Sequence, residues 1–160
     1  MRVGVLTGGG DCPGLNAVVR GIVCARDPDT EIYGFMNGWQ GTILGEYIPL
    51  TDADVEGIHI LGGTILGTSR TNPFKKEADT RQMFDTLERL KIDSLIAIGG
   101  DDTLSVAAKM ASVHFPVVGV PKTIDNDVSQ TDYTFGFHTA VNVGADAIDR
   151  LHSTAKSHKR

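Results

Sequence analysis

The strongest constraint in this sequence is one pattern that occurs three times along the chain. A short apolar run reaches a polar loop, and a helical segment follows. The runs cover residues 2–7, 94–98 and 115–120, and the predicted helices cover residues 15–25, 104–111 and 137–157. Apolar strands that alternate with helices pair in parallel through right-handed crossovers. The pattern predicts an α/β fold with a doubly wound, mainly parallel sheet in a Rossmann-like three-layer α/β/α arrangement.

Further elements fill the spaces between these units. Residues 31–36 suit a second strand, and residues 77–90 an amphipathic helix, because Met83, Leu87 and Leu90 recur at helical spacing. A threonine at position 51 predicts a capped short helix over residues 51–59. Residues 61–70 lack a clean period of either kind and are expected to form a loop with at most a brief strand.

Composition limits both the size and the class of the protein. With 160 residues, 41% of them hydrophobic, the chain can bury one core but not two, so we expect one domain. The formal net charge of -5 gives no reason to expect a nucleic-acid partner. The first apolar run is too short for a membrane span or a secretory signal. Cys12 and Cys24 lack metal-site spacing, so we expect reduced thiols in the cytoplasm.

Ligands of open α/β sheets bind beyond the carboxyl ends of the strands, so the three polar loops should meet in one crevice. The first loop, residues 8–14, contains Gly9 and Gly10 and opens a helix, so its amides and the helix dipole suit a phosphate. It matches neither the GxGxxG nor the Walker pattern. A tight structural turn is the alternative interpretation of this loop.

The second loop, residues 99–103, combines two glycines with two acids. Gly99 and Gly100 allow a phosphate to approach, and the carboxylate of Asp101 is a hard ligand suited to Mg²⁺ held between phosphates. A helix N-cap is the alternative for either aspartate. One cap needs one residue, so the second aspartate is left unexplained.

The third loop, residues 121–127, carries an acidic group. Thr123, Asp125 and Asp127 alternate, so in an extended segment their side chains point the same way. One carboxylate would accept a hydroxyl proton while another orients the acceptor or faces a metal. The alternative is an Asx-rich turn with solvated acids. Arg70 and Lys122 are candidate cations for phosphate charge, the alternative being ordinary surface charges.

Four stretches of the sequence, taken together, resemble the signature segments of the 6-phosphofructokinases. They are LTGGGDCPGLNA from Leu6, GGDDT from Gly99, PKTIDND from Pro121 and TDYTFGF from Thr131. The Gly-Gly-Asp motif is shared with NAD kinases and diacylglycerol kinases, whereas Thr-Ile-Asp-Asn-Asp is highly specific. An NAD-type or lipid kinase would leave residues 123–127 unexplained. The resemblance covers about the first half of a typical member, which implies a donor-binding lobe over residues 1–160 without the second, sugar-phosphate-binding lobe.

The resemblance implies a phosphotransferase of glycolysis that phosphorylates the C1 hydroxyl of fructose 6-phosphate. Asp125 would be the base, with Thr123 and Asp127 holding the substrate, and Asp101 would bind Mg²⁺. The donor phosphates would be surrounded by Gly9, Gly10, Arg70, Gly100, Asp102 and Thr103. Arg160 matches an arginine that reaches the sugar phosphate of a neighbouring subunit, which implies a homo-oligomer, a dimer or a tetramer.

Two positions bear on the phosphoryl donor. ATP-using bacterial members typically carry glycine at the positions of Asp102 and Lys122. A carboxylate at 102 would repel a nucleotide α-phosphate, and a lysine at 122 would pair with a terminal phosphate of pyrophosphate. We therefore expect pyrophosphate ahead of ATP. A function of another class, a non-catalytic phosphate-binding module, also fits these loops.

Overall fold

A computed structural model describes all residues 1–160. Its helices and strands are, in chain order, β1 (Arg2–Thr7), α1 (Leu15–Cys24), β2 (Glu31–Phe35), α2 (Trp39–Leu44), β3 (Tyr47–Leu50), the 3-10 helices η1 (Ile58–Ile60) and η2 (Pro73–Lys75), α3 (Glu77–Leu90), β4 (Ser94–Gly99), α4 (Asp101–Ser112), β5 (Val117–Thr123), β6 (Phe135–Gly136) and α5 (Phe137–Ser157). No helix is both long and apolar enough to cross a bilayer.

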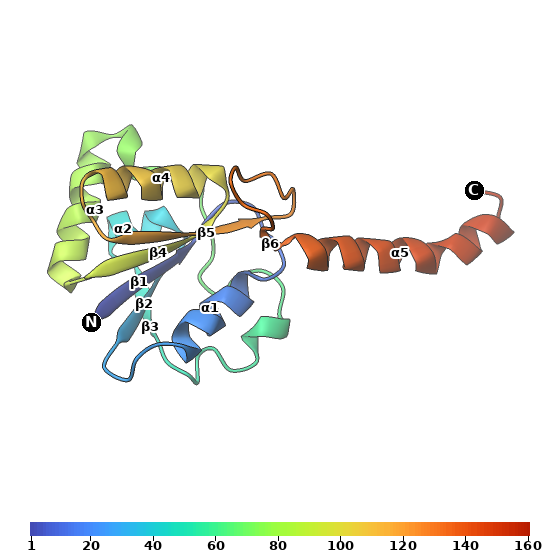
Figure 1. Ribbon diagram of the computed structural model, residues 1–160, viewed down its shortest axis with the longest axis horizontal. Coiled ribbons are helices and arrows are strands. Elements are labelled where there is room, and N and C mark those ends of the chain that lie inside the picture. The colour runs from blue at the N-terminus through green and yellow to red at the C-terminus, as the bar shows by residue number, and fades with distance from the viewer.

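The strands form one sheet of order β3-β2-β1-β4-β5-β6. All neighbouring strands are parallel except the β2–β3 pair, which is antiparallel. Helices α2, α3 and α4 lie on one face, and α1 with η1 lies on the other (Figure 1). The predicted three-layer, mainly parallel α/β fold is confirmed. The chain leaves β1 toward β2 and leaves β4 toward β5, so the strand order reverses between β1 and β4, where such folds bind ligands.

Two apolar clusters hold the layers together. One cluster packs the sheet against α2, α3 and α4, with Leu6, Phe35, Met83, Leu87 and Met110 among its members. The other cluster packs the opposite sheet face against α1 and η1, with Val5, Leu15, Val19, Val55 and Leu66 among its members. Close packing leaves no room for a side chain at several strand glycines: a Cβ on Gly4 would lie 2.4 Å from the Leu95 side chain, and one on Gly34 would lie 2.6 Å from the Leu66 side chain.

Some predicted elements have different bounds or a different form. The prediction of a short helix over residues 51–59 is wrong, and Thr51 does not act as a helix N-cap. The Thr51 N–H donates to the Asp54 carboxylate at 2.8 Å, and Gly57 adopts φ 73°, so turns lead into the single 3-10 turn η1. Helix α2, which begins at Trp39, and strand β3 were not expected from the sequence.

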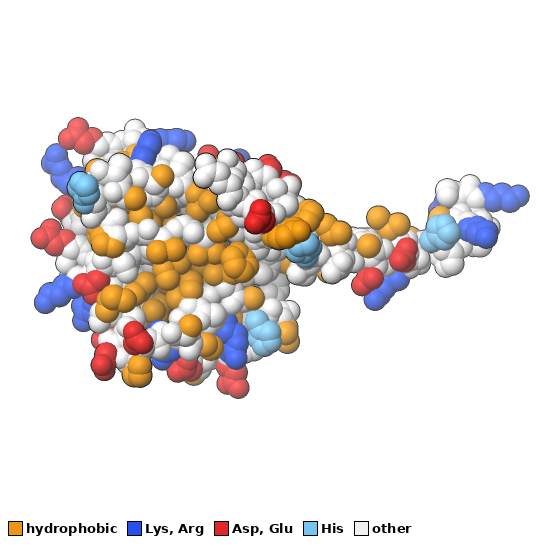
Figure 2. All heavy atoms as spheres, viewed as in Figure 1, with side chains coloured by type: hydrophobic (Ala, Val, Ile, Leu, Met, Phe, Trp, Pro, Cys, Tyr) orange, Lys and Arg blue, Asp and Glu red, His pale blue; other side chains and the backbone are white.

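The last helix has the predicted bounds but stands apart from the body of the domain (Figure 1). None of its residues is buried, and its apolar positions Val141, Ile148 and Leu151 are exposed. Hydrophobic side chains also gather over the sheet face beside α1 (Figure 2). A shallow cavity of about 820 Å³ lies there, lined by residues of α1, β5 and β6.

Candidate functional site

Two adjoining cavities lie where the polar loops leave the sheet. The first has a volume of about 650 Å³ and is lined by Gly9, Gly10, Trp39, Thr68, Ser69, Arg70, Thr71, Asn72, Lys75, Asp102 and Thr103. The second has a volume of about 270 Å³ and is lined by Gly9, Gly100, Asp101, Asp102, Thr103, Thr123, Asp125, Asp127 and Val128. They share the wall formed by Gly9, Asp102 and Thr103. The expected meeting of the three loops is therefore what the structure shows.

The shared wall is built by close contact between the first loop and the start of α4. The Gly8 N–H donates to the Ile98 carbonyl at 2.8 Å, which extends the β1–β4 pairing into the loop. Thr103 is only 4% exposed. A Cβ on Gly8 would lie 2.3 Å from its Oγ1, and a Cβ on Gly99 would lie 2.5 Å from its Cβ. Glycine at both positions lets the loop pack directly on the helix.

Helix α4 presents its N-terminus to both cavities. Its N-cap is Gly100, and no side chain caps it. The helix begins at Asp101, three residues before the predicted start at residue 104. Asp101 and Asp102 therefore lie in its first turn, and neither is the N-cap that was the alternative interpretation. The free N–H groups and the positive end of the helix dipole favour anions there. Helix α1 does not join it, because its N-cap Gly14 packs against Gly136 and lines neither cavity.

One wall of the first cavity is cationic. Arg70 and Lys75 are exposed there, Arg70 from the loop after β3 and Lys75 from η2. Hydrogen bonds fix the loop: the Thr7 hydroxyl donates to the Gly67 carbonyl at 2.8 Å, and the Ser69 hydroxyl donates to the Asn37 carbonyl at 2.7 Å. Two cations facing a helix N-terminus provide a site for several phosphate oxygens.

Lys75 and Trp39 are among the members of this cavity that were not expected from the sequence. Lys75 belongs to no sequence motif. It lies in the short 3-10 helix η2, which Asn72 caps by accepting from the Phe74 N–H at 2.9 Å. Trp39 is a core residue at 3% exposure, yet it also lines this cavity. Its indole N–H is buried without a hydrogen-bond partner.

The second cavity carries the acids. Thr123, at the end of β5, lines it together with Asp125 and Asp127. All three line one cavity as expected, but not through the extended backbone that the expectation assumed, because β5 ends at Thr123 and Asn126 adopts φ 52°. The Asp125 N–H donates to the Thr123 hydroxyl at 3.1 Å, which holds this turn. Asp101, from the first turn of α4, lines the same cavity.

Lys122 takes a different position from the other cations. Its side chain is 3% exposed and lines neither cavity, and its Nζ donates to the Gly10 carbonyl at 2.7 Å. Burial lowers the pKa of Lys122. The nearby Cys12 thiol is also buried, and burial raises its pKa. Direct pairing of Lys122 with a phosphate would require the ammonium group to leave Gly10.

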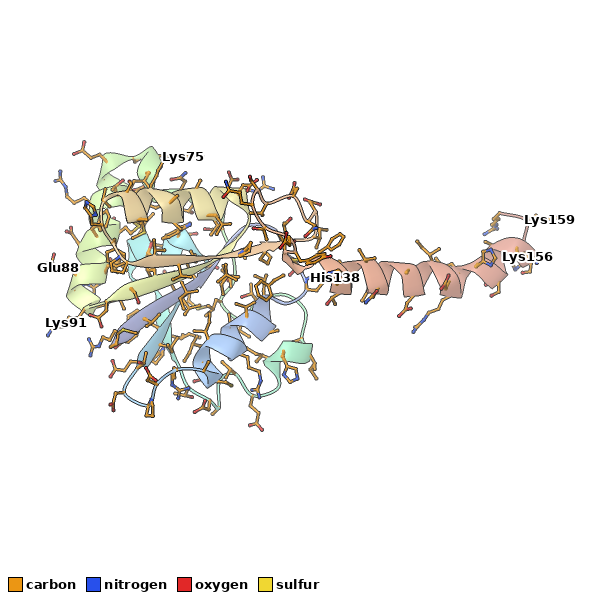
Figure 3. All side chains as sticks on the ribbon, viewed as in Figure 1. Lys75, Glu88, Lys91, His138, Lys156 and Lys159 are labelled. Carbon is orange, nitrogen blue, oxygen red and sulfur yellow. The ribbon has the colours of Figure 1, made fainter.

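For two further predictions this chain provides no complete binding site: the sugar-phosphate contact of Arg160 and the metal ion at Asp101. Arg160 follows α5, whose 21 residues span about 30 Å. Figure 3 shows Lys156 and Lys159 at the far end of this helix, opposite Lys75. No group of three or more His, Cys, Asp or Glu side chains lies close enough to hold a metal ion. A cation at Asp101 would therefore need oxygen ligands from a bound phosphate.

Comparisons with known proteins agree with this geometry. The family model described as Phosphofructokinase matches residues 2–160. Pyrophosphate--fructose 6-phosphate 1-phosphotransferase of Dictyoglomus thermophilum is 56% identical over 161 residues, covering 100% of this chain and 46% of the relative. ATP-dependent 6-phosphofructokinase of Corynebacterium efficiens is 52% identical over 163 residues, covering 100% and 47%.

A solved phosphofructokinase from Saccharomyces cerevisiae superposes with a TM-score of 0.86 at 30% identity, over 99% of this chain and 25% of that chain. The chain spans about half the length of the curated relatives it matches. Because the match extends over all but the first residue, the chain belongs to the phosphofructokinase family.

Proposed function

We propose that this chain forms the donor-binding N-terminal lobe of an enzyme that transfers a phosphoryl group from pyrophosphate or ATP to the C1 hydroxyl of fructose 6-phosphate, giving fructose 1,6-bisphosphate. One observation carries the proposal: a cationic cavity and an acidic cavity meet at the N-terminus of α4. A donor phosphate in the first cavity would have its terminal group beside the second. Phosphoryl transfer depends mainly on such positioning and on electrostatic stabilisation.

The first cavity would hold the donor. Arg70 and Lys75 would pair with its phosphate oxygens, and an arginine that stabilises the transferring group is worth on the order of 10³ to 10⁵ in rate. Gly9, Gly10 and Gly100 have no side chain that would keep a phosphate from the backbone. Thr103 would complete the wall. Its side chain fixes the loop rather than reaching far into either cavity.

The second cavity would hold the acceptor. Asp125 would accept the proton of the C1 hydroxyl as general base, while Asp127 and Thr123 orient the sugar phosphate. Asp101, which lines the same cavity, would hold Mg²⁺ together with donor phosphate oxygens, and the ion would neutralise phosphate charge. Its position at a helix N-terminus is compatible with this role, since neither capping nor an ion pair engages its carboxylate.

Pyrophosphate remains the donor we favour. The support is Asp102, whose carboxylate lies in the shared wall where a nucleotide would bring its α-phosphate. Lys122 would contribute by holding the Gly10 carbonyl, and so the shape of the loop, rather than by direct pairing. The names of the relatives at 55–57% identity specify pyrophosphate as the donor, and the names of those at 50–52% identity specify ATP.

A second lobe and a second subunit complete the proposal. The relatives are about twice as long, so we propose that a further lobe supplies more sugar-phosphate contacts. Arg160 stands too far from its own acidic cavity to reach it along α5, which suits a contact with the substrate of a neighbouring subunit in a dimer or tetramer. The cytoplasm is the proposed compartment, as for a glycolytic reaction.

The test is an activity assay with both donors. The 160-residue chain and the longest product of its reading frame are each incubated with fructose 6-phosphate, Mg²⁺ and either pyrophosphate or ATP. We expect fructose 1,6-bisphosphate from the longer product, faster with pyrophosphate. No product with either donor would refute the proposal.

A non-catalytic phosphate-binding module is the second candidate, because the glycines and cations of the first cavity line it without any residue of the acidic loop 121–127. Calorimetric titration of Mg-pyrophosphate and Mg-ATP onto the 160-residue chain separates binding from turnover. Binding by a longer product that forms no fructose 1,6-bisphosphate would favour this candidate over the enzyme.

A further inference from the structure

Residues outside the proposed catalytic set hold the acidic loop in place, and they do so without lining the second cavity. Strand β6 pairs with the end of β5, with Lys122 opposite Phe135 and Thr123 opposite Gly136. After residues 124–134, this pairing brings the chain back beside the end of β5. Asp125 and Asp127 face the cavity, whereas Asn126 between them does not line it. The side chain of Asn126 instead turns toward Thr134.

Thr134 holds the loop at two points. Its hydroxyl donates to the Thr123 carbonyl at 2.8 Å, and its N–H donates to Asn126 Oδ1 at 2.9 Å. The hydroxyl also lies 3.3 Å from Asn126 Oδ1, but it has a single proton, and the shorter contact takes it. Thr134 is 4% exposed, so water competes little for these bonds.

Asn126 adds a third bond and the shape of the turn. Its Nδ2 donates to the Asp132 carbonyl at 3.4 Å, and its backbone adopts φ 52°, a left-handed conformation that asparagine tolerates better than most residues. The backbone of Asp125 is thereby fixed on both sides to one buried threonine: at Thr123 before it and at Asn126 after it.

We propose that Asn126 and Thr134 are positioning residues for the acidic cavity: their hydrogen bonds to each other and to the Thr123 carbonyl form a clip that sets the direction of the Asp125 and Asp127 carboxylates. Neither Asn126 nor Thr134 lines either of the two cavities. This inference rests on the proposed function for its kinetic consequence, but the clip is also testable without any activity.

The kinetic test compares isosteric and conservative variants in the longest product of the reading frame. Thr134→Val keeps the shape and the N–H but removes the hydroxyl, and Asn126→Gly keeps the freedom of positive φ but removes the acceptor. We expect each to lower kcat about tenfold or more, since a shift of about 1 Å in a reacting group costs up to about 100-fold. The dissociation constant of Mg-pyrophosphate should stay unchanged, and Thr134→Ser should restore most of kcat.

Thr86→Val is the matched control. Thr86 is also 4% exposed, but it lies in α3 and lines neither cavity, so its replacement should leave kcat unchanged. Wild-type kcat in both Thr134→Val and Asn126→Gly would overturn the proposal. Equal losses in Thr134→Val and Thr86→Val would overturn it as well, because they would mean general destabilisation.

Hydrogen exchange on the 160-residue chain separates the clip from the reaction. Thr134→Val should speed amide exchange over residues 124–127, while Thr134→Ser and Thr86→Val should not. Unchanged exchange in Thr134→Val would overturn the clip even in an active enzyme. Wild-type protein without phosphofructokinase activity would refute the proposed function alone, and the exchange result would still decide the clip.

Discussion

Replacing Gly8 with alanine tests the contact on which the shared wall of the two cavities depends. The new Cβ would lie 2.3 Å from Thr103 Oγ1, 3.0 Å from its Cγ2 and 3.2 Å from its Cβ, where ordinary contact begins at 3.4 Å. The nearest pair is therefore about 1.1 Å too close, and Thr103 is a β-branched residue with little rotamer freedom in a helix. Overpacking of this kind costs about 1–3 kcal/mol of the free energy of unfolding.

The assay is urea unfolding of Gly8→Ala, Thr103→Ala and the double variant. Thr103→Ala removes the two closest atoms, so the double variant should be less destabilised than the sum of the single variants by about 1–2 kcal/mol. Gly10→Ala is the control in the same loop, because nothing lies within 4 Å of its added Cβ, and its stability should change by no more than about 0.5 kcal/mol. Additive effects of Gly8→Ala and Thr103→Ala would refute the packing argument.

Four further predictions concern the site and its surroundings. Asp125→Ser should lower kcat by about 10² to 10⁴ while Mg-pyrophosphate still binds by calorimetry, and retained turnover would contradict the assignment of the base. Replacing Asp102 and Lys122 together with glycine should shift the ratio of kcat/KM toward ATP, whereas an unchanged ratio would mean that other residues select the donor. Iodoacetamide should alkylate exposed Cys24 quickly and buried Cys12 only after unfolding. Because burial raises the pKa of Cys12, the folded state binds the thiol proton more tightly than the unfolded state does, and the contribution of Cys12 to the free energy of unfolding should fall as pH rises through the thiol range. In urea unfolding, Cys12→Ala should show a smaller fall with pH than the wild type. An equal fall in both proteins would contradict this prediction.

Local sequence determined those elements whose signal lies within a few residues. The amphipathic period of α3 and the apolar stripe of α5 gave both helices their observed bounds, since helical spacing is repeated over several turns. The same holds for β1. Thr123, Asp125 and Asp127 line one cavity as expected, but Asn126 between them adopts φ 52°, so a turn rather than an extended strand end brings them together. Local signals failed at Thr51, whose hydroxyl and amide both donate to Asp54 instead of capping a helix.

Tertiary structure decided which of these residues face the same space. Pairing of β1 with β4 places the first loop on the N-terminus of α4 rather than leaving the α1 terminus to hold an anion. Burial turns Lys122 toward the Gly10 carbonyl, and the capped η2 turn brings Lys75 beside Arg70. A sequence shows which side chains carry charge, but pairing between strands distant along the chain sets their mutual positions, because those contacts depend on the whole sheet.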